Sequence, residues 1–235
     1  MFKAMILAAG LGTRLLPLTL NQPKALVEVA GKPLIEHVLD RFRLLGIRDI
    51  VVNLHHHSGQ LQAFLGSEKF KEFNITFSDE SGQLLDTGGA IRKASWFFDN
   101  GQPFLVHNCD VISLVPLNEL MQAHKRNRAI ATLAVSDRKT SRPLAFTPNG
   151  KLIDRWNEKT SHASRPLAFS GIYVLDPAIF SFMPNVDAFS IIDVLVTAAA
   201  TRPVFAFEHS PEIWVDAGNV NNLEKAEQLL ENFHL

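Results

Sequence analysis

An apolar segment that runs straight into a glycine-rich loop is the feature that most constrains this chain. Phe2 to Ala9 is apolar except for Lys3, as expected for a strand buried on both faces of a sheet. Gly10 and Gly12 follow at once. Because these two positions lack side chains, backbone N–H groups can approach phosphate oxygens closely. The start of the chain therefore predicts an α/β domain with a phosphate-binding loop after its first strand.

This loop differs from two common phosphate-binding motifs. Leu15 stands where a dinucleotide-binding fingerprint has its third glycine, and no Gly-Lys-Ser/Thr of a Walker loop follows. Arg14 and Lys24 supply two cations, which can neutralise a leaving pyrophosphate and the phosphoryl centre. From these residues alone, a tight turn with two solvated cations stays an alternative.

Apolar stretches alternate with amphipathic ones along the first half of the chain. Between Pro33 and Leu45 apolar residues recur at helical spacing, and Gly46 is typical of a helix end. Such alternation predicts a mostly parallel sheet with helices on both faces. The further strands expected are 49–54, 75–78, 104–108 and 130–135, and the further helices are 60–65, 89–98 and 117–126.

The pattern changes after residue 140, where an antiparallel addition is expected. Leu144 to Phe146 and Leu152 to Trp156 flank an Asn149-Gly150 turn, which is typical of a β-hairpin. Beyond it we expect strands at 168–175 and 204–208 and helices at 191–200 and 221–232. The fold class is therefore α/β, with a Rossmann-like mixed sheet.

Composition supports an ordinary globular domain and excludes some partners. Of 235 residues, 46% are hydrophobic and 20% charged, a balance that can form a normal core. The net charge of -1 lacks the basic field of a nucleic-acid binder. No segment reaches the roughly 20 apolar residues of a membrane helix. The single cysteine, Cys109, fits a reducing compartment, so a cytoplasmic location is expected.

The loop and several later motifs resemble those of the sugar-1-phosphate nucleotidylyltransferases. The loop reads Leu7-x-x-Gly10-x-Gly12-Thr13-Arg14-x-x-Pro17, followed by Pro23-Lys24. The later matches are Gly31-Lys32-Pro33-Leu34-Ile35, Thr87-Gly88-Gly89-Ala90, Asn108-Cys109-Asp110, Phe169-Ser170-Gly171-Ile172-Tyr173 and Trp214-Val215-Asp216-Ala217-Gly218-Asn219. The resemblance implies the nucleotide-diphospho-sugar transferase fold in a single domain over 1–235. It also implies a nucleotide-binding part at 1–136, and a sugar-binding part with the C-terminal helix at 137–235.

The resemblance also implies a nucleotide site. Arg14 and Lys24 are expected to be catalytic, because they would face the phosphates. Glu80 and Gly88 are expected to border the base pocket, with a solvated loop charge as the alternative for Glu80. The remaining residues expected to bind the nucleotide lie in the first loop and are Leu7, Ala8, Ala9, Gly10, Gly12 and Thr13.

Two acids are the expected metal ligands. Asp110 ends an apolar strand, and Asp216 follows Ile213-Trp214-Val215, although an acid at a strand end is also a common turn or cap residue. The resemblance implies that both bind Mg²⁺, a hard cation that prefers carboxylate and phosphate oxygens. Sequence spacing by itself does not bring the two together. Cys109 replaces the family's usual glycine and is interpreted as a small buried hydrophobe.

The sugar side carries four expected contacts. Asn108 and Gly171 lie in matched motifs, and Glu158-Lys159 resembles the family's Glu-Lys-Pro element, with Thr160 in place of the proline. His55-His56-His57 suggests a metal site at first sight. However, consecutive residues of an extended segment point in different directions, so a polar loop is the preferred interpretation.

The expected reaction is a direct in-line displacement, in which the sugar phosphate attacks the α-phosphorus of a nucleoside triphosphate and pyrophosphate leaves. The compact chain and its Ala8-Ala9 and Trp214-Val215-Asp216 strings favour UTP with N-acetylmuramate 1-phosphate. Alternatives are a mannose- or heptose-1-phosphate guanylyltransferase, a phosphocholine cytidylyltransferase, and a non-catalytic regulatory subunit. The sequence leaves the oligomeric state open.

Overall fold

The computed structural model describes residues 2–162 and 164–232, which form two compact units. Unit 1 comprises residues 2–84, 107–114 and 212–232, and unit 2 comprises residues 85–106, 115–162 and 164–211. The chain passes from unit 2 to unit 1 within strand β6 (Phe104–Asn108). Helices and strands alternate through both units, so the predicted α/β class is confirmed. The predicted division of the chain at residue 136 stays a prediction.

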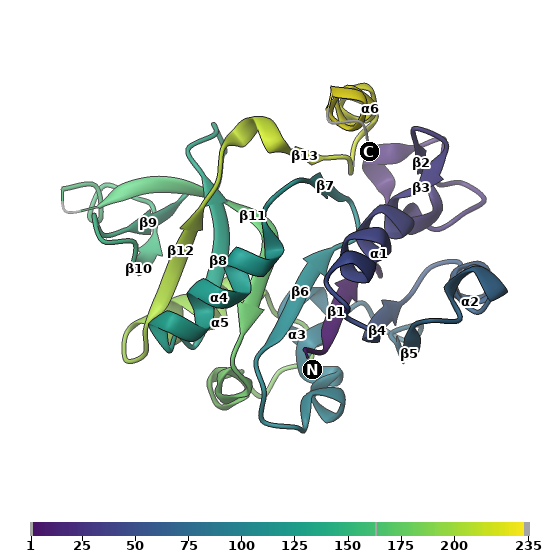
Figure 1. Ribbon diagram of the computed structural model, residues 1–235. Coiled ribbons are helices and arrows are strands. Elements are labelled where there is room, and N and C mark those ends of the chain that lie inside the picture. Colours follow the sequence, from purple (N-terminus) through teal and green to yellow (C-terminus); the bar gives the residue numbers. More distant parts are fainter. Residues whose placement is uncertain (1, 163, 233–235) are drawn as a thin grey trace. The chain divides into compact units, whose positions relative to one another are not determined.

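Unit 1 is built on three parallel strands (Figure 1). They are β1 (Ala4–Leu7), β4 (Asp49–Leu54) and β5 (Asn74–Asp79), in the order β1-β4-β5. Residues in the middle of β1 and β4 are fully buried, which explains why these segments are continuous apolar runs. Because the strands are parallel, the residues that follow them meet at one edge of the sheet. This edge carries the first loop.

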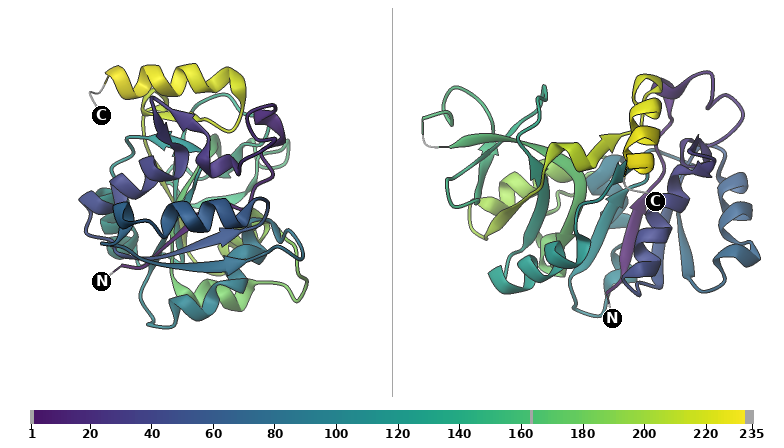
Figure 2. Two further views of the ribbon diagram at one scale, coloured as in Figure 1. Left: turned by 90° about the vertical axis from the view of Figure 1, so that its right-hand side faces the viewer. Right: turned by 45° about the horizontal axis from the view of Figure 1, so that its top comes forward.

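Three helices complete unit 1, namely α1 (Leu34–Leu44), α2 (Ser58–Leu65) and α6 (Leu223–Asn232). Each was expected within a few residues of these bounds. Figure 2 shows α6 in yellow, and this helix contacts β2 and β13. Its apolar face joins a buried cluster that also anchors the first loop through Leu15. The other members of this cluster are Val27, Val29, Leu34, Ile112, Ala217, Ala226, Leu229 and Leu230.

Two short antiparallel ladders in unit 1 were not predicted. One pairs β2 (Glu28–Val29) with β3 (Lys32–Pro33). The other pairs β7 (Val111–Ser113) with β13 (Trp214–Asp216), so that Asp216 lies opposite Val111. Strands of two or three residues are too short to show an alternating pattern.

The 3-10 helices of unit 1 are η1 (Thr13–Leu15), η2 (Lys24–Leu26), η3 (Glu68–Phe70) and η7 (Val220–Asn222), and η6 (Pro211–Ile213) begins in unit 2 and ends in unit 1.

Unit 2 contains the antiparallel addition. The predicted hairpin is confirmed as β9 (Leu144–Phe146) paired with β10 (Leu152–Arg155). The long strand β11 (Arg165–Leu175) pairs antiparallel with β9 and with β8 (Ala131–Ser136), and β12 (Val204–Glu208) runs parallel to β8. These pairings make the strands of unit 2 mainly antiparallel.

The helices of unit 2 are α3 (Asp86–Lys93), α4 (Leu117–Asn127) and α5 (Ile191–Ala199), with 3-10 helices η4 (Ser95–Phe98) and η5 (Pro177–Phe182). Helix α4 packs on β8, β11 and β12, whereas α5 contacts β10, β12 and α3. The helix expected at 89–98 is in fact two elements, α3 and η4, because the α-helix ends at Lys93.

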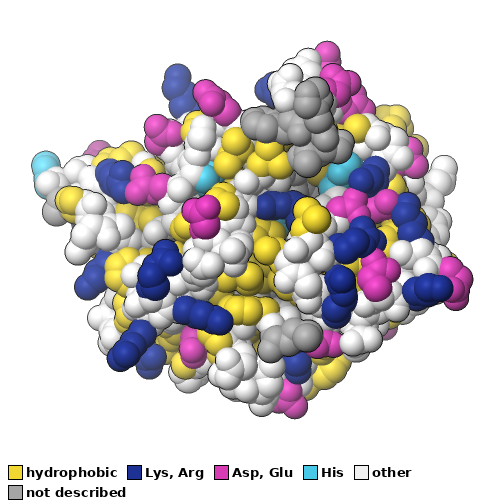
Figure 3. Space-filling model, in the orientation of Figure 1, with side chains coloured by type: hydrophobic (Ala, Val, Ile, Leu, Met, Phe, Trp, Pro, Cys, Tyr) yellow, Lys and Arg dark blue, Asp and Glu magenta, His cyan; other side chains and the backbone are white. Residues whose placement is uncertain are grey.

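The distribution of charged side chains on the surface agrees with the net charge of -1. On the face shown in Figure 3, Lys and Arg side chains lie intermingled with Asp and Glu side chains. Within residues 2–162 and 164–232, no helix is both long and apolar enough to span a bilayer.

Candidate active site

The first loop folds tightly after β1 and brings Lys24 beside it. Gly12 has φ 68°, and its carbonyl accepts hydrogen bonds from the hydroxyl of Thr19 (2.9 Å) and the N–H of Leu15 (2.8 Å). A Cβ at Gly12 would stand 2.8 Å from Thr19 Cγ2, so only glycine fits there. The Lys24 side chain lies alongside Gly10, with Nζ 4.0 Å from the position of a Cβ there. The loop residues and Lys24 therefore form one compact structure.

The two predicted metal ligands come together, because the strands next to them pair. Asp110 directly precedes β7, and Asp216 is the last residue of β13. The N–H of Ala217 donates to the Asp110 carbonyl at 2.8 Å, which closes the ladder at this end. The two carboxylates, which are distant in sequence, therefore belong to one rigid corner of unit 1.

Gly218 marks the point where the carboxylates and Arg14 converge. A Cβ built on Gly218 would lie 2.5 Å from Asp110 Oδ2, 2.7 Å from Asp216 Oδ1 and 2.9 Å from Arg14 Nη2. The N–H of Gly218 also donates to Asp216 Oδ1 at 2.8 Å. One small volume is thus bordered by two carboxylates and a guanidinium. Gly218 lies in the Trp214-to-Asn219 motif, whose resemblance to the family did not indicate a role for this glycine.

Each carboxylate is paired with one of the two predicted cations. The Lys24 ammonium is hydrogen-bonded to Asp110 Oδ2, and both side chains are only 12% exposed. Arg14 Nη1 lies 3.5 Å from Asp216 Oδ2 and is more open, with 59% of its side chain exposed. Burial by itself would lower the pKa of Lys24, but the negative charges of Asp110 and Asp216 outweigh it and raise that pKa. Lys24 is therefore a fixed positive charge at any physiological pH.

A second set of buried polar groups supports the loop from the side of the sheet. Asn53 Oδ1 accepts from the Ala8 N–H, and Asn53 Nδ2 donates to Glu80 Oε1, each at 2.7 Å. The Glu80 carbonyl also contacts His55 Nδ1 at 2.8 Å. Glu80 is 1% exposed, so the alternative of a solvated loop charge is wrong. Through Asn53, the Glu80 side chain is thus linked to the backbone of the first loop at Ala8.

Removing Asn53 should weaken this support. We expect Asn53→Ala to lower the free energy of unfolding by about 2–3 kcal/mol, because the buried Glu80 carboxylate loses one hydrogen bond and the Ala8 N–H loses this acceptor. Urea denaturation measures the change. Asn74→Ala is the matched control, because Asn74 also donates from its amide to an acid, Asp49, but at an exposed position. A stability of Asn53→Ala equal to that of the control would contradict the assigned role.

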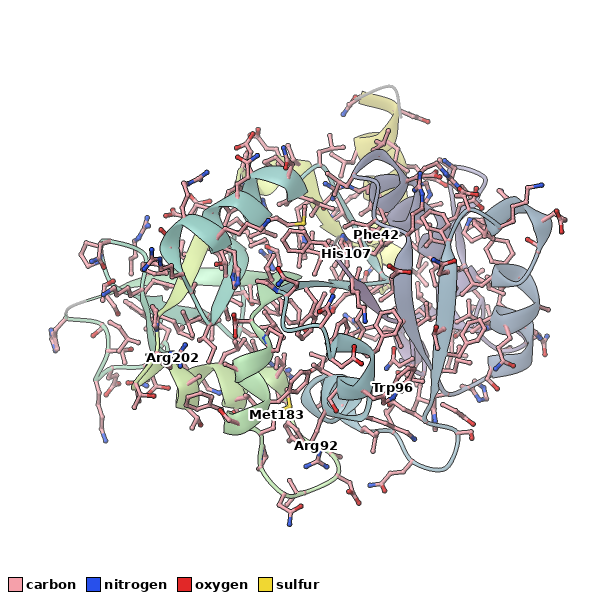
Figure 4. All side chains as sticks on the ribbon, turned by 60° about the horizontal axis from the view of Figure 1, so that its bottom comes forward. Phe42, Arg92, Trp96, His107, Met183 and Arg202 are labelled. Atoms are coloured by element: carbon pink, nitrogen blue, oxygen red, sulfur yellow. The ribbon has the colours of Figure 1, made fainter. Side chains whose placement is uncertain are left out.

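Two buried groups next to Asp110, His107 and Cys109, are neutral. Figure 4 shows Phe42 next to His107, and their rings meet edge to face at 6.1 Å. Burial, assisted by the charge of Arg41, lowers the pKa of His107 to about 3, so the imidazole is neutral. Cys109 is buried as expected, and burial raises the pKa of its thiol to about 12. Neither group is therefore a charged competitor for Asp110.

The other predicted residues lie in several places. Leu7, Ala9, Thr13 and Asn108 belong to unit 1 with the loop. Gly88 lies in unit 2 and packs against Phe189, since a Cβ there would be 2.5 Å from the Phe189 ring. Its N–H donates to the Phe189 carbonyl at 2.8 Å. This packing requires a glycine at position 88, and its predicted place beside the nucleobase stays a prediction.

The predicted sugar contacts of unit 2 lie on a turn and on a strand. Glu158 and Lys159 are exposed in a turn after β10, which Asn157 Oδ1 caps by accepting from the Lys159 N–H at 2.9 Å. Gly171 lies within β11 and has φ 72°. His55, His56 and His57 follow β4 in a loop, and no group of three metal-ligating side chains occurs in the described part of the chain.

Comparison with known proteins decides the family. Residues 3–232 match the family described as Nucleotidyl transferase. The chain belongs to the nucleotidyl transferase family. It is 34% identical to an N-acetylmuramate alpha-1-phosphate uridylyltransferase of Caulobacter vibrioides, over 92% of this chain and 91% of that protein. It is also 32% identical to a mannose-1-phosphate guanyltransferase of Yarrowia lipolytica, over 92% of this chain but 60% of that protein.

Solved structures agree on the fold of this nucleotidyl transferase. A UDP-glucose pyrophosphorylase from Acinetobacter baumanii matches with a TM-score of 0.81 at 21% identity, covering 100% of this chain and 94% of that one. The predicted nucleotide-diphospho-sugar transferase fold is therefore confirmed. Family and relatives together support the predicted activity class, that of a sugar-1-phosphate nucleotidyltransferase.

Proposed function

We propose that this nucleotidyl transferase joins UMP, taken from UTP, to N-acetylmuramate 1-phosphate and releases pyrophosphate. The observation that carries the proposed chemistry is the convergence of Asp110, Asp216 and Arg14 on Gly218, with Lys24 bound to Asp110. The choice of sugar and base is supported by the similarity to the Caulobacter uridylyltransferase along almost its whole length. A mannose-1-phosphate guanylyltransferase is the second candidate, because those relatives are similarly identical.

Asp110 and Asp216 fit a divalent metal ion. Both carboxylates lie within 2.7 Å of a single point, and one of them also accepts a backbone N–H that fixes its orientation. Two carboxylates leave room for the waters and phosphate oxygens that Mg²⁺ prefers to keep. When bound there, Mg²⁺ would supply positive charge against a triphosphate. Lys24, now paired with Asp110, would share that carboxylate or turn to the phosphates.

The remaining groups position and stabilise charge. The loop offers backbone N–H groups at Gly10 and Gly12, and Arg14 is exposed enough to meet a phosphate from solvent. In the proposed reaction an oxygen of the sugar phosphate forms a bond to the α-phosphorus as the bond to pyrophosphate breaks. The attacking phosphate oxygen is already ionised, so no general base is needed. The protein contributes orientation and electrostatic stabilisation.

A competition experiment tests the choice of substrate. The protein is mixed with Mg²⁺, equal amounts of UTP and GTP, and equal amounts of N-acetylmuramate, mannose, heptose and glucose 1-phosphates. Mass spectrometry then identifies the nucleotide sugars that form. We expect UDP-N-acetylmuramate as the main product. GDP-mannose as the main product would contradict the proposed substrate and favour the second candidate.

A further inference from the structure

Strand β11 is bulged at Gly171, which is one of the predicted sugar contacts. Phe169 lies opposite Val135 and Tyr173 lies opposite Leu133, so three residues of β11 face one residue of β8. The bulged residues are Ser170, Gly171 and Ile172. A bulge of this kind removes regular ladder hydrogen bonds and redirects the strand, and such bulges are common next to active sites.

Arg138, two residues beyond the end of β8, binds the bulge. Its Nη1 donates to the Ala168 carbonyl at 3.1 Å and to the hydroxyls of Ser136 and Ser170 at 3.0 Å each. Its Nη2 donates to the Phe169 carbonyl. A planar guanidinium with a fixed fork of donors suits a set of convergent oxygens far better than an ammonium does. Arg138 thus holds the three residues immediately before Gly171.

Ser170 extends this contact to His209, the residue that follows β12. It is fully buried, and its hydroxyl contacts His209 Nε2 at 2.8 Å. His209 Nδ1 faces the Ser210 carbonyl at 2.8 Å, so Nδ1 carries the hydrogen and Nε2 accepts one from Ser170. Burial, together with the positive charge of Arg138, lowers the pKa of His209, which favours the neutral imidazole. The N–H of His209 also donates to the Val135 carbonyl at 3.0 Å.

We propose that Arg138 is a positioning residue for the sugar phosphate, which acts through Ser170 and His209 by fixing the bulge of β11 at Gly171. The inference rests on the proposed function and on the prediction that Gly171 of β11 contacts the sugar. It explains why a half-buried arginine fork, a serine and a histidine from three separate segments of unit 2 meet at this one bulge. Arg138 itself needs no contact with the substrate.

Steady-state kinetics with each substrate varied in turn tests the inference. We expect Arg138→Gln to raise the KM for the sugar 1-phosphate about 30-fold, because several charge-assisted hydrogen bonds to the bulge are lost. The KM for the nucleoside triphosphate should change less than about twofold, because unit 1 carries the predicted phosphate loop. Arg138→Lys should be nearly as impaired as Arg138→Gln, since one ammonium cannot replace the fork. Arg126→Gln, an exposed arginine of α4 in the same unit, is the matched control.

The outcomes separate the inference from the proposed function. An equal change in both KM values, or full activity of Arg138→Lys, overturns the positioning role. If Arg138→Gln does not fold, Ser170→Ala decides: a sugar KM equal to that of the wild type overturns the inference, and a selective rise supports it. A folded wild-type protein that uses none of the sugar phosphates would contradict the proposed function and the inference with it.

Discussion

Asp110→Asn should lower kcat by about 1,000-fold, because it removes one of two charges proposed to hold the metal at the reacting phosphate. The substitution keeps the size of the side chain and an oxygen that can still accept from Lys24. The fold should therefore survive, as circular dichroism and thermal unfolding can show. Pyrophosphate release under saturating substrates measures the loss.

A surface acid provides the control for this prediction. Asp99→Asn removes one negative charge at an exposed position of unit 2 and should leave kcat unchanged. The Mg²⁺ concentration for half-maximal rate should also rise for any residual activity of Asp110→Asn. An Asp110→Asn protein within about fivefold of the wild type would contradict the metal assignment, since loss of a ligand to a catalytic metal costs far more.

Gly218→Ala should be the second severe change, although it adds only one methyl group. The new Cβ would lie 2.5 Å from Asp110 Oδ2 and 2.7 Å from Asp216 Oδ1, distances that real Cβ contacts do not reach. The carboxylates must move apart, so we expect kcat to fall about 100-fold, as displacements of about 1 Å do in positioned sites. Gly218 is not among the glycines with positive φ, so the substitution tests space and not backbone strain.

Gly59→Ala is the matched control, since a Cβ at Gly59 in α2 has no atom within 4 Å. It should retain wild-type activity. If Gly218→Ala were as active as Gly59→Ala, the volume next to Gly218 would not be the catalytic one. A loss of activity accompanied by unfolding would point to a structural effect, so both variants need a thermal melting curve.

Long, strongly patterned elements were predictable from the sequence. Strands β4, β6 and β12 have the predicted bounds, because each is a compact apolar run bounded by polar or turn residues. Helix α6 shows its apolar stripe in the sequence because it packs on one cluster only. In these segments the local pattern and the tertiary packing agree.

The meeting of Asp110 and Asp216 could not be derived from any pattern. It depends on β7 and β13, which have three residues each and pair across a large sequence separation. Only the resemblance to a family indicated it. Glu80 shows a different limit of the sequence, because an acid in a polar segment can equally be a solvent-exposed loop charge. Its burial and its hydrogen bond with Asn53 are visible only in the structure. The roles of Glu158 and Lys159 stay predictions.

The most direct test of the whole account is pyrophosphate release over a grid of the four nucleoside triphosphates against sugar 1-phosphates, with phosphocholine as an outlying acceptor. We predict release with UTP and N-acetylmuramate 1-phosphate, dependent on Mg²⁺ and abolished by EDTA. A folded protein that binds a triphosphate but releases no pyrophosphate in any combination would contradict catalysis by the Asp110–Asp216 corner and favour a regulatory subunit.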